Sequence, residues 1–510
     1  MNLLNRISDR VPPYVALIPV CVGVFVAADD QTVIVTVLPQ IMLDMEVPIT
    51  EIDHASWAIT GYLLGYLVGM PLIGRVSDVW GHRRLYILSV LAFMIGSVAV
   101  ALTQSLNWMI AARVFQAIGA GALVPIAIAI VGDLFPRGKR ALPLGIVGAA
   151  AEAGGVIGPL WGGVIIRYLD WRWVFWINIP LAVLTIALIL LMLRPSPRFP
   201  ASIDVIGGAL VAAALTCTTL AFSRIGSFDW LGGAFVAGAV FSLVLFILRQ
   251  RSATDPLLPP AMFRVLAFVT ANITHLLLGA ALIIGMVTVP LMANTVMGRT
   301  PLEGGLWLMR MTAGIPVGAF LGGLMAQRLD LRFPATAGLV FSAIGFWLVS
   351  GWGLDIGEPE LTLHLLVVGF GFGLLIVPIA LAGTETVGED IRATAASMVT
   401  ALRIVGMTFG VAALTAWGVA RFDILAADIR LPLAEATQTR AEAQAQIDQF
   451  TDRVNDAGLA LFQEFFVIAA AVCLIAVIPA VLMIVNKTAG RQSHPLTGDA
   501  DVLPDRQRDA

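Results

Sequence analysis

Fourteen continuous apolar runs are the feature that most constrains this chain, because each is long enough to cross a lipid bilayer as a helix. Inside lipid, backbone groups must be hydrogen-bonded internally, so only helices and closed β-barrels span a membrane. Barrel strands alternate apolar and polar residues over about 10 positions, whereas these runs are continuous. The sequence therefore predicts an all-α polytopic membrane protein. The predicted spans are 13–39, 56–77, 85–104, 108–132, 141–167, 172–193, 204–223, 231–249, 265–292, 303–326, 335–353, 361–383, 394–421 and 459–485.

Composition leaves no room for a large soluble domain. Of the 510 residues, 58% are hydrophobic and only 13% are charged, and the mean hydropathy is +0.89. A soluble chain carries roughly a quarter charged residues. We therefore exclude soluble enzymes, nucleic-acid-binding proteins and secreted disulfide scaffolds, and we expect no nucleic-acid partner.

Residue types that bind metals or perform catalysis are few and dispersed. The three cysteines lie in apolar runs without metal-ligand spacing, and the five histidines form no cluster. The sequence also contains no nucleophile–base pair at usable spacing, so we expect no enzyme activity, no metal site and no cofactor. His275 lies alone within a predicted span, where packing or a hydrogen bond is the more common role of a histidine.

The distribution of positive charge predicts the orientation of the spans. When the N-terminus is placed inside, most of the 31 lysines and arginines fall in inside segments. An even number of spans then puts both termini in the cytoplasm. The first apolar run is longer than the apolar region of a signal peptide and has no cleavage-like site, so we interpret it as a retained span.

Two polar segments interrupt the pattern of short loops. The outer segment 422–458 separates the last two spans, and after Pro432 it is rich in residues that favour helices. A straight helix over 433–458 would reach about 39 Å beyond the bilayer, and a folded-back hairpin is equally allowed. The segment is either a solvated amphipathic loop or a functional extension. Residues 487–510 are polar and predict a disordered cytoplasmic tail.

The loop after the second span combines glycines with charged residues. It reads Gly74-Arg75-Val76-Ser77-Asp78-Val79-Trp80-Gly81-His82-Arg83-Arg84. Glycine permits sharp turns and close approach of helices, and Asp78 can pair with the arginines across a helix end. Such a pairing forms a latch that opens when two halves of a protein rock. A degraded copy, Gly322 to Asp330, has Gln327 in place of the aspartate and indicates an internal repeat.

Further motifs lie within predicted spans. Span 4 contains Arg113-Val114-Phe115-Gln116-Ala117-Ile118-Gly119-Ala120-Gly121, and span 5 contains Gly154-Gly155-Val156-Ile157-Gly158-Pro159-Leu160-Trp161-Gly162-Gly163. Span 6 opens with Trp171-Arg172-Trp173-Val174-Phe175-Trp176-Ile177-Asn178-Ile179-Pro180, and span 1 contains Asp30-Gln31-Thr32-Val33-Ile34-Val35-Thr36-Val37-Leu38-Pro39. Gly154 and Gly158 share one helix face, which permits close packing. With Pro159, the same segment can instead form a bendable helix near a central path.

Together with the loop after span 2, these segments resemble motifs A, B and C of the major facilitator superfamily and two helix motifs of its fourteen-span drug:proton antiporter branch. Thr36 stands where that branch is expected to have asparagine. The resemblance covers essentially the whole chain except the tail. It implies a major facilitator fold in which 1–193 and 265–486 are two six-helix halves and 194–264 carries two inserted linker helices. It also implies a monomer in the bacterial cytoplasmic (inner) membrane and, through motif C, an exporter.

Charged residues within the spans are the sharpest functional signal, because each is costly in hydrocarbon. Span 1 carries Asp29 and Asp30, span 5 carries Glu152, and span 13 carries Arg403. Asp29 and Asp30 point about 100° apart on a helix, and Asp30 is the one that matches the branch motif. In the superfamily fold these three spans line the central path. We therefore expect Asp30, Glu152 and Arg403 to converge near mid-membrane.

With two acidic residues and one arginine, one carboxyl group has no basic partner and can bind a proton. An unpaired buried carboxyl holds its proton, and a carboxyl paired with arginine releases it. The predicted mechanism is therefore coupling to the proton gradient, without a metal. The alternative is a static buried ion pair that fixes helix packing. By resemblance to motif B, Arg113 is the next candidate, as a proton-relay or gating residue. A predicted inner loop holds four more charged residues that we expect to be solvated, Glu385, Glu389, Asp390 and Arg392.

The predicted path offers mainly aliphatic residues, Met and Phe, so we expect a lipophilic cargo. Tyr62-Leu63-Leu64-Gly65-Tyr66, Ala151-Glu152 and Val411 to Gly418 resemble the sub-branch of mycobacterial triacylglycerol and multidrug exporters. That resemblance implies export of triacylglycerol-like lipids or hydrophobic drugs, an outer-side lipid-carrying lipoprotein as a partner, and a role for 422–458 in guiding lipid outward. Two alternatives stay open, namely a generic multidrug:proton antiporter without a lipid role and a proton-independent lipid flippase.

Overall fold

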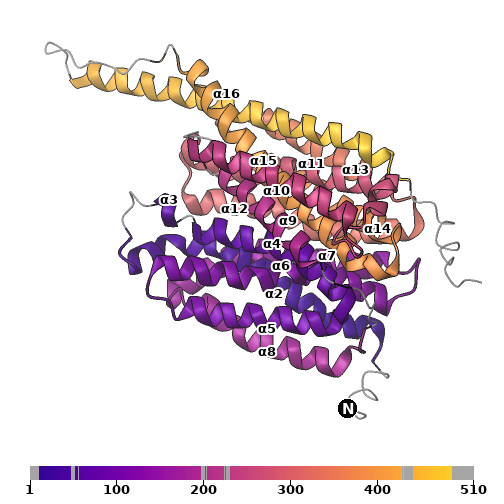
Figure 1. Cartoon of the computed structure of the whole chain (residues 1–510). Helices are drawn as coiled ribbons and strands as arrows, with labels where there is room; N and C mark the ends of the chain where they lie inside the picture. The colour runs from indigo at the N-terminus through magenta and orange to yellow at the C-terminus, as the bar shows by residue number, and fades with distance from the viewer. Residues whose placement is uncertain are drawn as a thin grey trace, which may run out of the picture.

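The computed structural model describes residues 11–47, 52–55, 57–196, 202, 204–222, 224, 230–427, 429 and 440–484. Within these ranges all regular structure is helical, and the helices lie side by side in one bundle from which one long helix projects (Figure 1). The predicted all-α architecture is confirmed. The tail predicted over 487–510 lies outside the described residues.

Six long helices form the N-terminal half. They are α2 (Pro13–Asp44), α4 (Trp57–Trp80), α5 (His82–Ala101), α6 (Leu106–Leu134), α7 (Ala141–Tyr168) and α8 (Trp173–Met192), with the short α3 (Ile52–Ala55) before α4. Within this half α2 packs on α7, α4 packs on α6, and α5 packs on both α6 and α8.

The C-terminal half repeats this arrangement. Its helices are α11 (Leu266–Thr295), α12 (Pro301–Arg328), α13 (Arg332–Ser350), α14 (Glu360–Glu385), α15 (Arg392–Leu425) and α16 (Arg440–Val481), with the short turns η3 (Pro260–Arg264) and η4 (Glu389–Ile391) before α11 and α15. Here α11 packs on α15, α12 packs on α14, and α13 packs on both α14 and α16. Helices at equivalent places in the two halves therefore have equivalent neighbours, as the repeated glycine motif predicts.

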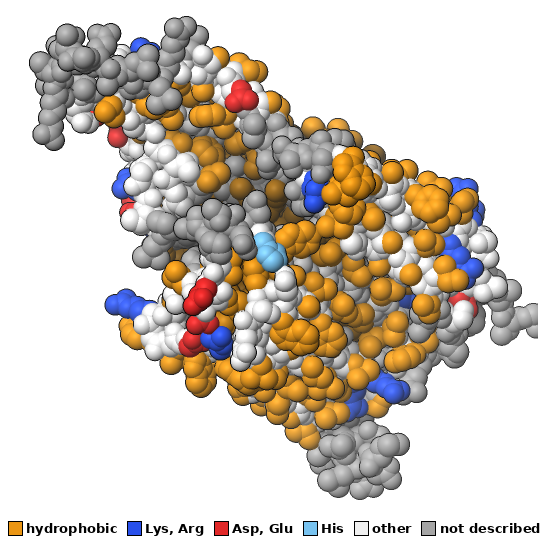
Figure 2. Space-filling model, turned by 60° about the vertical axis from the view of Figure 1, so that its left-hand side comes forward, with side chains coloured by type: hydrophobic (Ala, Val, Ile, Leu, Met, Phe, Trp, Pro, Cys, Tyr) orange, Lys and Arg blue, Asp and Glu red, His pale blue; other side chains and the backbone are white. Residues whose placement is uncertain are grey.

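Two further helices occupy the region predicted as an insertion. α9 (Val205–Phe222) and α10 (Trp230–Ser252) pack against each other, and α9 also contacts α4 and α15. Large apolar side chains of α10, such as Val236, Val240 and Phe241, are exposed. The face of the protein in Figure 2 is likewise mostly hydrophobic, with charged side chains towards its margins. Such a surface suits contact with lipid, because its exposure to water would be unfavourable.

The number of membrane spans depends on how two helices are counted. Twelve described helices are long and apolar enough to cross a membrane, and the total is thirteen if the two parts of α4, which meet at a 40° bend, count as one span. α9 contains a shorter apolar helix, Val205–Ala221. All fourteen predicted runs fall on helices, while the count of fourteen spans stays a prediction.

The predicted outer extension is mostly helical where the structure describes it. α16 is a continuous helix of 42 residues, and its first part projects beyond the bundle (Figure 1). Arg421 of α15 anchors it by donating two hydrogen bonds of 2.8 and 2.7 Å to the carboxylate of Glu464. Residues 430–439 lie outside the described part of the chain. The guiding role of the extension stays a prediction.

Candidate functional site

A buried polar cluster surrounds Asp30 inside the N-terminal half. The Asp30 side chain is 1% exposed, and it accepts hydrogen bonds from three residues on two other helices. Arg113 of α6 donates at 2.5 Å, Gln116 of α6 at 3.0 Å and Asn178 of α8 at 2.9 Å. Ser97 of α5 connects to the same cluster through Gln116. The cluster thus joins four helices of one half, α2, α5, α6 and α8.

Arg113 is the counter-charge of this cluster. Its side chain is fully buried, and its guanidinium carbon lies 4.0 Å from the centroid of the Tyr62 ring. A guanidinium over an aromatic face gains cation–π stabilisation, which grows as water is excluded. Asp30 and Arg113, both predicted as site residues, are therefore held in a dry and well-partnered setting.

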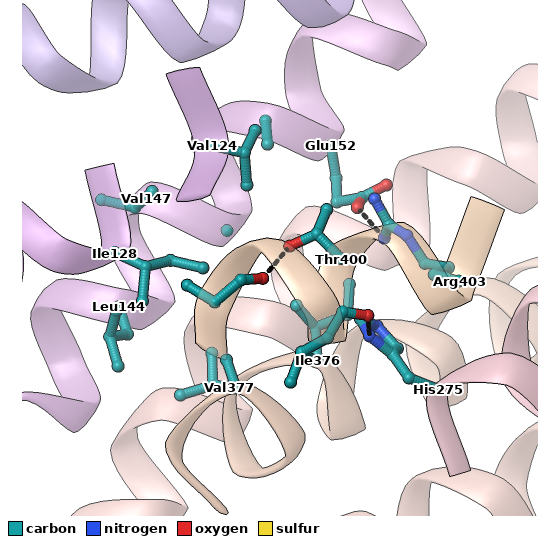
Figure 3. Close-up of a pocket in the computed structure, with 15 residues that line it drawn as sticks. Val124, Ile128, Leu144, Val147, Glu152, His275, Ile376, Val377, Thr400 and Arg403 are labelled. Atoms are coloured by element: carbon teal, nitrogen blue, oxygen red, sulfur yellow. Dashed lines mark hydrogen bonds and ion pairs between the residues drawn. The ribbon is translucent and has the colours of Figure 1, made fainter. Parts of the chain in front are cut away.

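A second ion pair connects the two halves. Arg403 of α15 donates a 2.7 Å hydrogen bond to Glu152 of α7, and both side chains are largely buried. The pair lines a cavity of about 50 Å³ whose other walls come mainly from apolar residues of α6, α7, α14 and α15. Figure 3 shows the two charged heads meeting at this cavity, with Thr400 and His275 nearby. Any separation of α7 from α15 must break this pair.

The predicted triad is thus divided between two places. Glu152 forms an ion pair with Arg403, whereas Asp30 forms an ion pair with Arg113. The prediction that Asp30, Glu152 and Arg403 converge is therefore wrong. The physical reason is the rotation of α2, whose Asp30 side chain points into its own half. Gln116 and Asn178 were missed as partners, although both lie within the motifs of spans 4 and 6.

The segment from Gly74 to Arg84 forms a contact between the halves at one end of the bundle. Asp78 accepts hydrogen bonds from the backbone N–H groups of Ala393 and Thr394, both at 3.0 Å, and from the Thr394 hydroxyl at 2.7 Å. These groups lie at the start of α15, where amides lack helical partners and favour a negative charge. Asp78 therefore caps a helix of the opposite half.

The arginines of this motif have other partners. Arg83 donates to the carbonyl oxygen of Leu190 at 2.8 Å, and the guanidinium of Arg84 lies over the ring of Trp80. His82 instead bridges two acids, with ring nitrogens 3.2 Å from Asp78 and 2.7 Å from Asp133. Backbone amides and a histidine therefore take the place that the prediction gave to the arginines, and the role of this contact as a latch stays a prediction.

Glycine is required at two positions of the motif for different structural reasons. Gly81 has φ +95°, a conformation that side-chain-bearing residues rarely adopt, and it separates α4 from α5. A Cβ atom at Gly74 would lie 2.7 Å from the Ser397 hydroxyl of α15, so glycine is needed for the close approach of the halves. In the second-half copy, Gly323 of α12 approaches Ala141 and Gly145 of α7 in the same way.

A second charged contact between the halves was not expected. Arg140 is buried and donates a 2.6 Å hydrogen bond to Glu385, while Glu389 forms ion pairs with Arg137, Arg140 and Arg392. The interpretation of this loop as solvated is therefore wrong for Glu385 and Arg392. Loops at the end of one half are covered by the other half, and the sequence of neither loop reveals this.

Disruption of the latch should change the balance between conformations. Asp78→Asn removes the charge that caps α15, and a hydrogen bond to a charged group is worth about 1.5–3 kcal/mol, so we expect a roughly 10- to 100-fold loss of the latched population. Spin labels at the exposed residues Lys139 and Gln327 report the separation of the halves at this end by double electron–electron resonance. Asp170→Asn, which alters an exposed acid after α7, is the control. An unchanged distance distribution in Asp78→Asn would contradict the latch.

The glycines of motif C pack α7 against α2. A Cβ atom at Gly154 would lie 2.2 Å from the Phe25 carbonyl oxygen, and one at Gly158 would lie 2.7 Å from the Asp29 carbonyl oxygen. Gly162 also faces α2, whereas a Cβ atom at Gly163 would meet its nearest neighbour only at 4.0 Å. Pro159 lies within the helix. The face formed by Gly154, Gly158 and Gly162 explains close packing, while the bending of α7 stays a prediction.

Addition of a single methyl group to this glycine face tests whether it requires close packing of α2 on α7. Gly158→Ala forces α2 and α7 apart, and such overpacking costs about 1–3 kcal/mol, so we expect a lower thermal unfolding temperature in detergent. Gly163→Ala on the same helix places the same methyl group in open space and serves as the matched control. Equal unfolding temperatures for the two variants would mean that the α2–α7 contact is more yielding than the structure indicates.

The motif at the start of span 6 holds the C-terminal end of α2. The Trp171 indole donates a 3.2 Å hydrogen bond to Asp44, and the Arg172 guanidinium lies 2.8 Å from the same carboxylate. The hydrogen bond from Trp171, together with the charge of Arg172, lowers the pKa of Asp44 below its usual range. This motif therefore joins α2 to α8 at the end of the bundle away from Asp78.

Comparison with known proteins identifies the family. The model of the Major Facilitator Superfamily matches residues 20–411. The chain belongs to this superfamily. A triacylglyceride transporter of Mycolicibacterium hassiacum is 35% identical, with 92% of this chain and 91% of the relative covered. A triacylglyceride transporter of Mycobacterium tuberculosis is 33% identical, with 92% and 94% covered.

Solved structures of superfamily members share the fold. The human organic anion transporter MFSD10 superposes with a TM-score of 0.61 at 16% identity, covering 92% of this chain and 99% of that one. The proton:xylose symporter XylE superposes with a TM-score of 0.57 at 14% identity, covering 90% and 94%. These similarities establish the major facilitator fold.

Proposed function

We propose that this superfamily member is a proton-coupled secondary active exporter of lipophilic substrates, triacylglycerol-like lipids or hydrophobic drugs, that works by alternating access. The observation that carries the proposal is the ion pair between Glu152 and Arg403. This pair connects the two halves inside the bundle and lines a cavity between them. Its formation and rupture therefore change how strongly the halves are held together.

Protonation of Glu152 is the proposed coupling step. A neutral carboxylic acid no longer compensates Arg403, and an uncompensated buried charge is costly. The halves then rearrange until Arg403 reaches water or another acceptor, and loss of the proton re-forms the pair. Asp30 is the second candidate proton site, and Arg113, which holds it, is the candidate relay.

The latch supports an assignment of the conformational state. In the predicted orientation, the Asp78 and Arg140 contacts lie on the cytoplasmic side, so the described state is closed towards the cytoplasm. Protons then reach Glu152 from the outside, which is the side from which a proton-driven exporter takes them. The proposed exporter couples this inward movement of the proton to the outward movement of its cargo.

Apolar surfaces support a lipophilic cargo. The cavity at Glu152 is too small for a lipid, but an open groove of about 620 Å³ runs between α2, α7 and α8, with walls that include Leu17, Phe25 and Leu181. Apolar grooves of this size suit acyl chains or drug-sized molecules. The triacylglyceride transporters described above favour a lipid.

The proposed location is the bacterial cytoplasmic membrane, with a monomeric protein and both termini in the cytoplasm. α2 begins and α16 ends at the same end of the bundle (Figure 1), as an even number of spans requires. A lipid-carrying lipoprotein outside the membrane would meet the protein at the other end, where α16 projects. Co-purification of such a lipoprotein with the full chain, lost when the projection is removed, tests this partner.

Transport into inverted membrane vesicles tests the function. With fluorescent triacylglycerol as the probe, an imposed pH gradient should drive accumulation, and a protonophore should abolish it. A transport rate that is the same with and without the pH gradient would identify a proton-independent flippase. Accumulation of a hydrophobic dye but not of triacylglycerol would identify a generic multidrug:proton antiporter.

A further inference from the structure

The cavity beside Glu152 has mainly apolar walls, with a few polar groups among them. Four of its lining residues carry groups that can exchange hydrogen bonds with water, namely Glu152, His275, Thr400 and Arg403. A volume of about 50 Å³ exceeds what one water molecule requires, and polar partners on several sides are what retain buried water. The cavity is therefore suited to a short chain of water molecules.

His275 of α11 lines this cavity, and only one of its two ring nitrogens has a hydrogen-bond partner. Its Nδ1 is 2.6 Å from the carbonyl oxygen of Val399 on α15. A carbonyl oxygen only accepts, so Nδ1 carries the proton, and Nε2 of the neutral ring has a free lone pair. Two of the buried polar atoms that have no hydrogen-bond partner in the described part of the chain belong to this cavity, Nε2 of His275 and Nε of Arg403. A histidine with a purely packing role normally has both nitrogens satisfied.

The position of His275 relative to the ion pair indicates the direction in which a proton would move through the site. Its partner Val399 lies one helical turn before Arg403 on α15, on the side of the latch at Ala393. The charged groups that line the cavity with it are Arg403 of α15 and Glu152 of α7, and Tyr66 of α4 interacts electrostatically with that pair. A proton that leaves Glu152 towards the latch thus meets His275 next.

We propose that His275 is a second proton-binding residue of the transport cycle, which accepts through cavity water the proton that Glu152 releases. The proposal rests on the proton coupling proposed above. In this step the O–H bond of Glu152 breaks and an N–H bond forms at Nε2 of His275. The carboxylate pairs again with Arg403, so the summed charge of the three groups stays at +1. The histidine then delivers the proton to the cytoplasmic side when the latch opens.

The test compares His275→Gln with Thr274→Val in proteoliposomes, with fluorescent triacylglycerol as the transported probe. Glutamine keeps a donor for the Val399 carbonyl oxygen but cannot be protonated in this pH range. Thr274 is a fully buried neighbour on the same helix that does not line the cavity, which makes it a matched control. We measure proton-driven accumulation and gradient-free exchange of the same probe between pH 5.5 and 8.5. His275→Asn is the second variant if glutamine perturbs folding.

The expected result is a loss of proton-driven accumulation of at least about 10-fold in His275→Gln, with exchange retained and with a flattened pH profile. Thr274→Val should behave as wild type. Wild-type coupling and pH profile in both histidine variants would overturn the role of His275 while leaving the proposed function intact. Absence of proton-driven transport in the wild type would overturn both. Parallel loss of exchange and coupling in both histidine variants would assign His275 to packing.

Nitrogen chemical shifts give a readout that does not depend on the cargo. The chain has five histidines, so the signal missing from His275→Gln assigns His275 in protein labelled with ¹⁵N-histidine. Proton acceptance requires that Nε2 of His275 titrates when Glu152→Gln removes the competing acid or when the pH is lowered. A signal that stays in the neutral Nδ1–H form in every state would contradict the proposal.

Discussion

Glu152→Gln should reduce proton-driven export at least about 100-fold, the scale on which positioned proton-transfer groups act, while the protein stays folded. Glutamine keeps the shape of the side chain but cannot cycle between a neutral acid and a charged partner of Arg403. The Arg403 guanidinium is then permanently without its counter-charge, so the halves lose both the 2.7 Å ion pair and its dependence on protons. Accumulation of fluorescent triacylglycerol in inverted vesicles measures the loss.

A matched ion pair elsewhere in the chain provides the control. Arg421 and Glu464 are also 2.7 Å apart, but both belong to the C-terminal half. Glu464→Gln therefore removes the same chemical interaction without affecting the contact between halves, and we expect near-normal transport. Arg403→Ala should resemble Glu152→Gln, and the double variant should be little worse than either, because both residues serve one interaction. Undiminished proton-driven transport in Glu152→Gln would refute the mechanism.

Asp30→Ala should destabilise the protein by about 3–5 kcal/mol, the cost of leaving a buried charge without its partner. Asp30 is the acceptor for Arg113, Gln116 and Asn178, and the Arg113 guanidinium is fully buried. Thermal unfolding in detergent, followed by the reactivity of the partly buried Cys21 in α2, measures the effect. We also expect loss of transport, because the helices of the N-terminal half lose their common polar centre.

The adjacent acid is the control for this prediction. Asp29 is partly exposed and points away from the Asp30 cluster, so Asp29→Ala should cost much less stability. Replacement of the charged pair by apolar residues, Asp30→Leu with Arg113→Met, should recover part of the stability lost in Asp30→Ala, since no isolated charge remains. If Asp29→Ala and Asp30→Ala are equally stable, the cluster does not hold the N-terminal half together.

The two charged sites differ in what a rocking motion does to them. The Asp30–Arg113 pair lies inside one half and travels with it, whereas the Glu152–Arg403 pair spans both halves. The halves also have largely separate hydrophobic cores, so they can move as bodies. Rocking therefore acts directly on the second pair, and it reaches the first indirectly, through the packing of helices such as α2 on α7 and α6 on α15.

Much of the fold could be read from the sequence because helix formation in lipid is a local property. Each predicted run contains enough apolar residues to fix a helix at its own position, and all fourteen fall on helices. The motif glycines were equally readable, since Gly81 and Gly158 are needed by the backbone or by a neighbouring helix at short range. The loop charges were not readable, because Glu385 and Arg392 are covered by residues of the other half.

The sequence by itself determined that this chain is a helical membrane protein and which few charged residues within it require an explanation. Only the tertiary structure decided which acid meets which base. Asp30 and Arg113 are 83 positions apart and Glu152 and Arg403 are 251 apart, so their pairing depends on the rotation of each helix about its axis. That rotation is set by packing against neighbouring helices, and neither apolar content nor motif spacing specifies it.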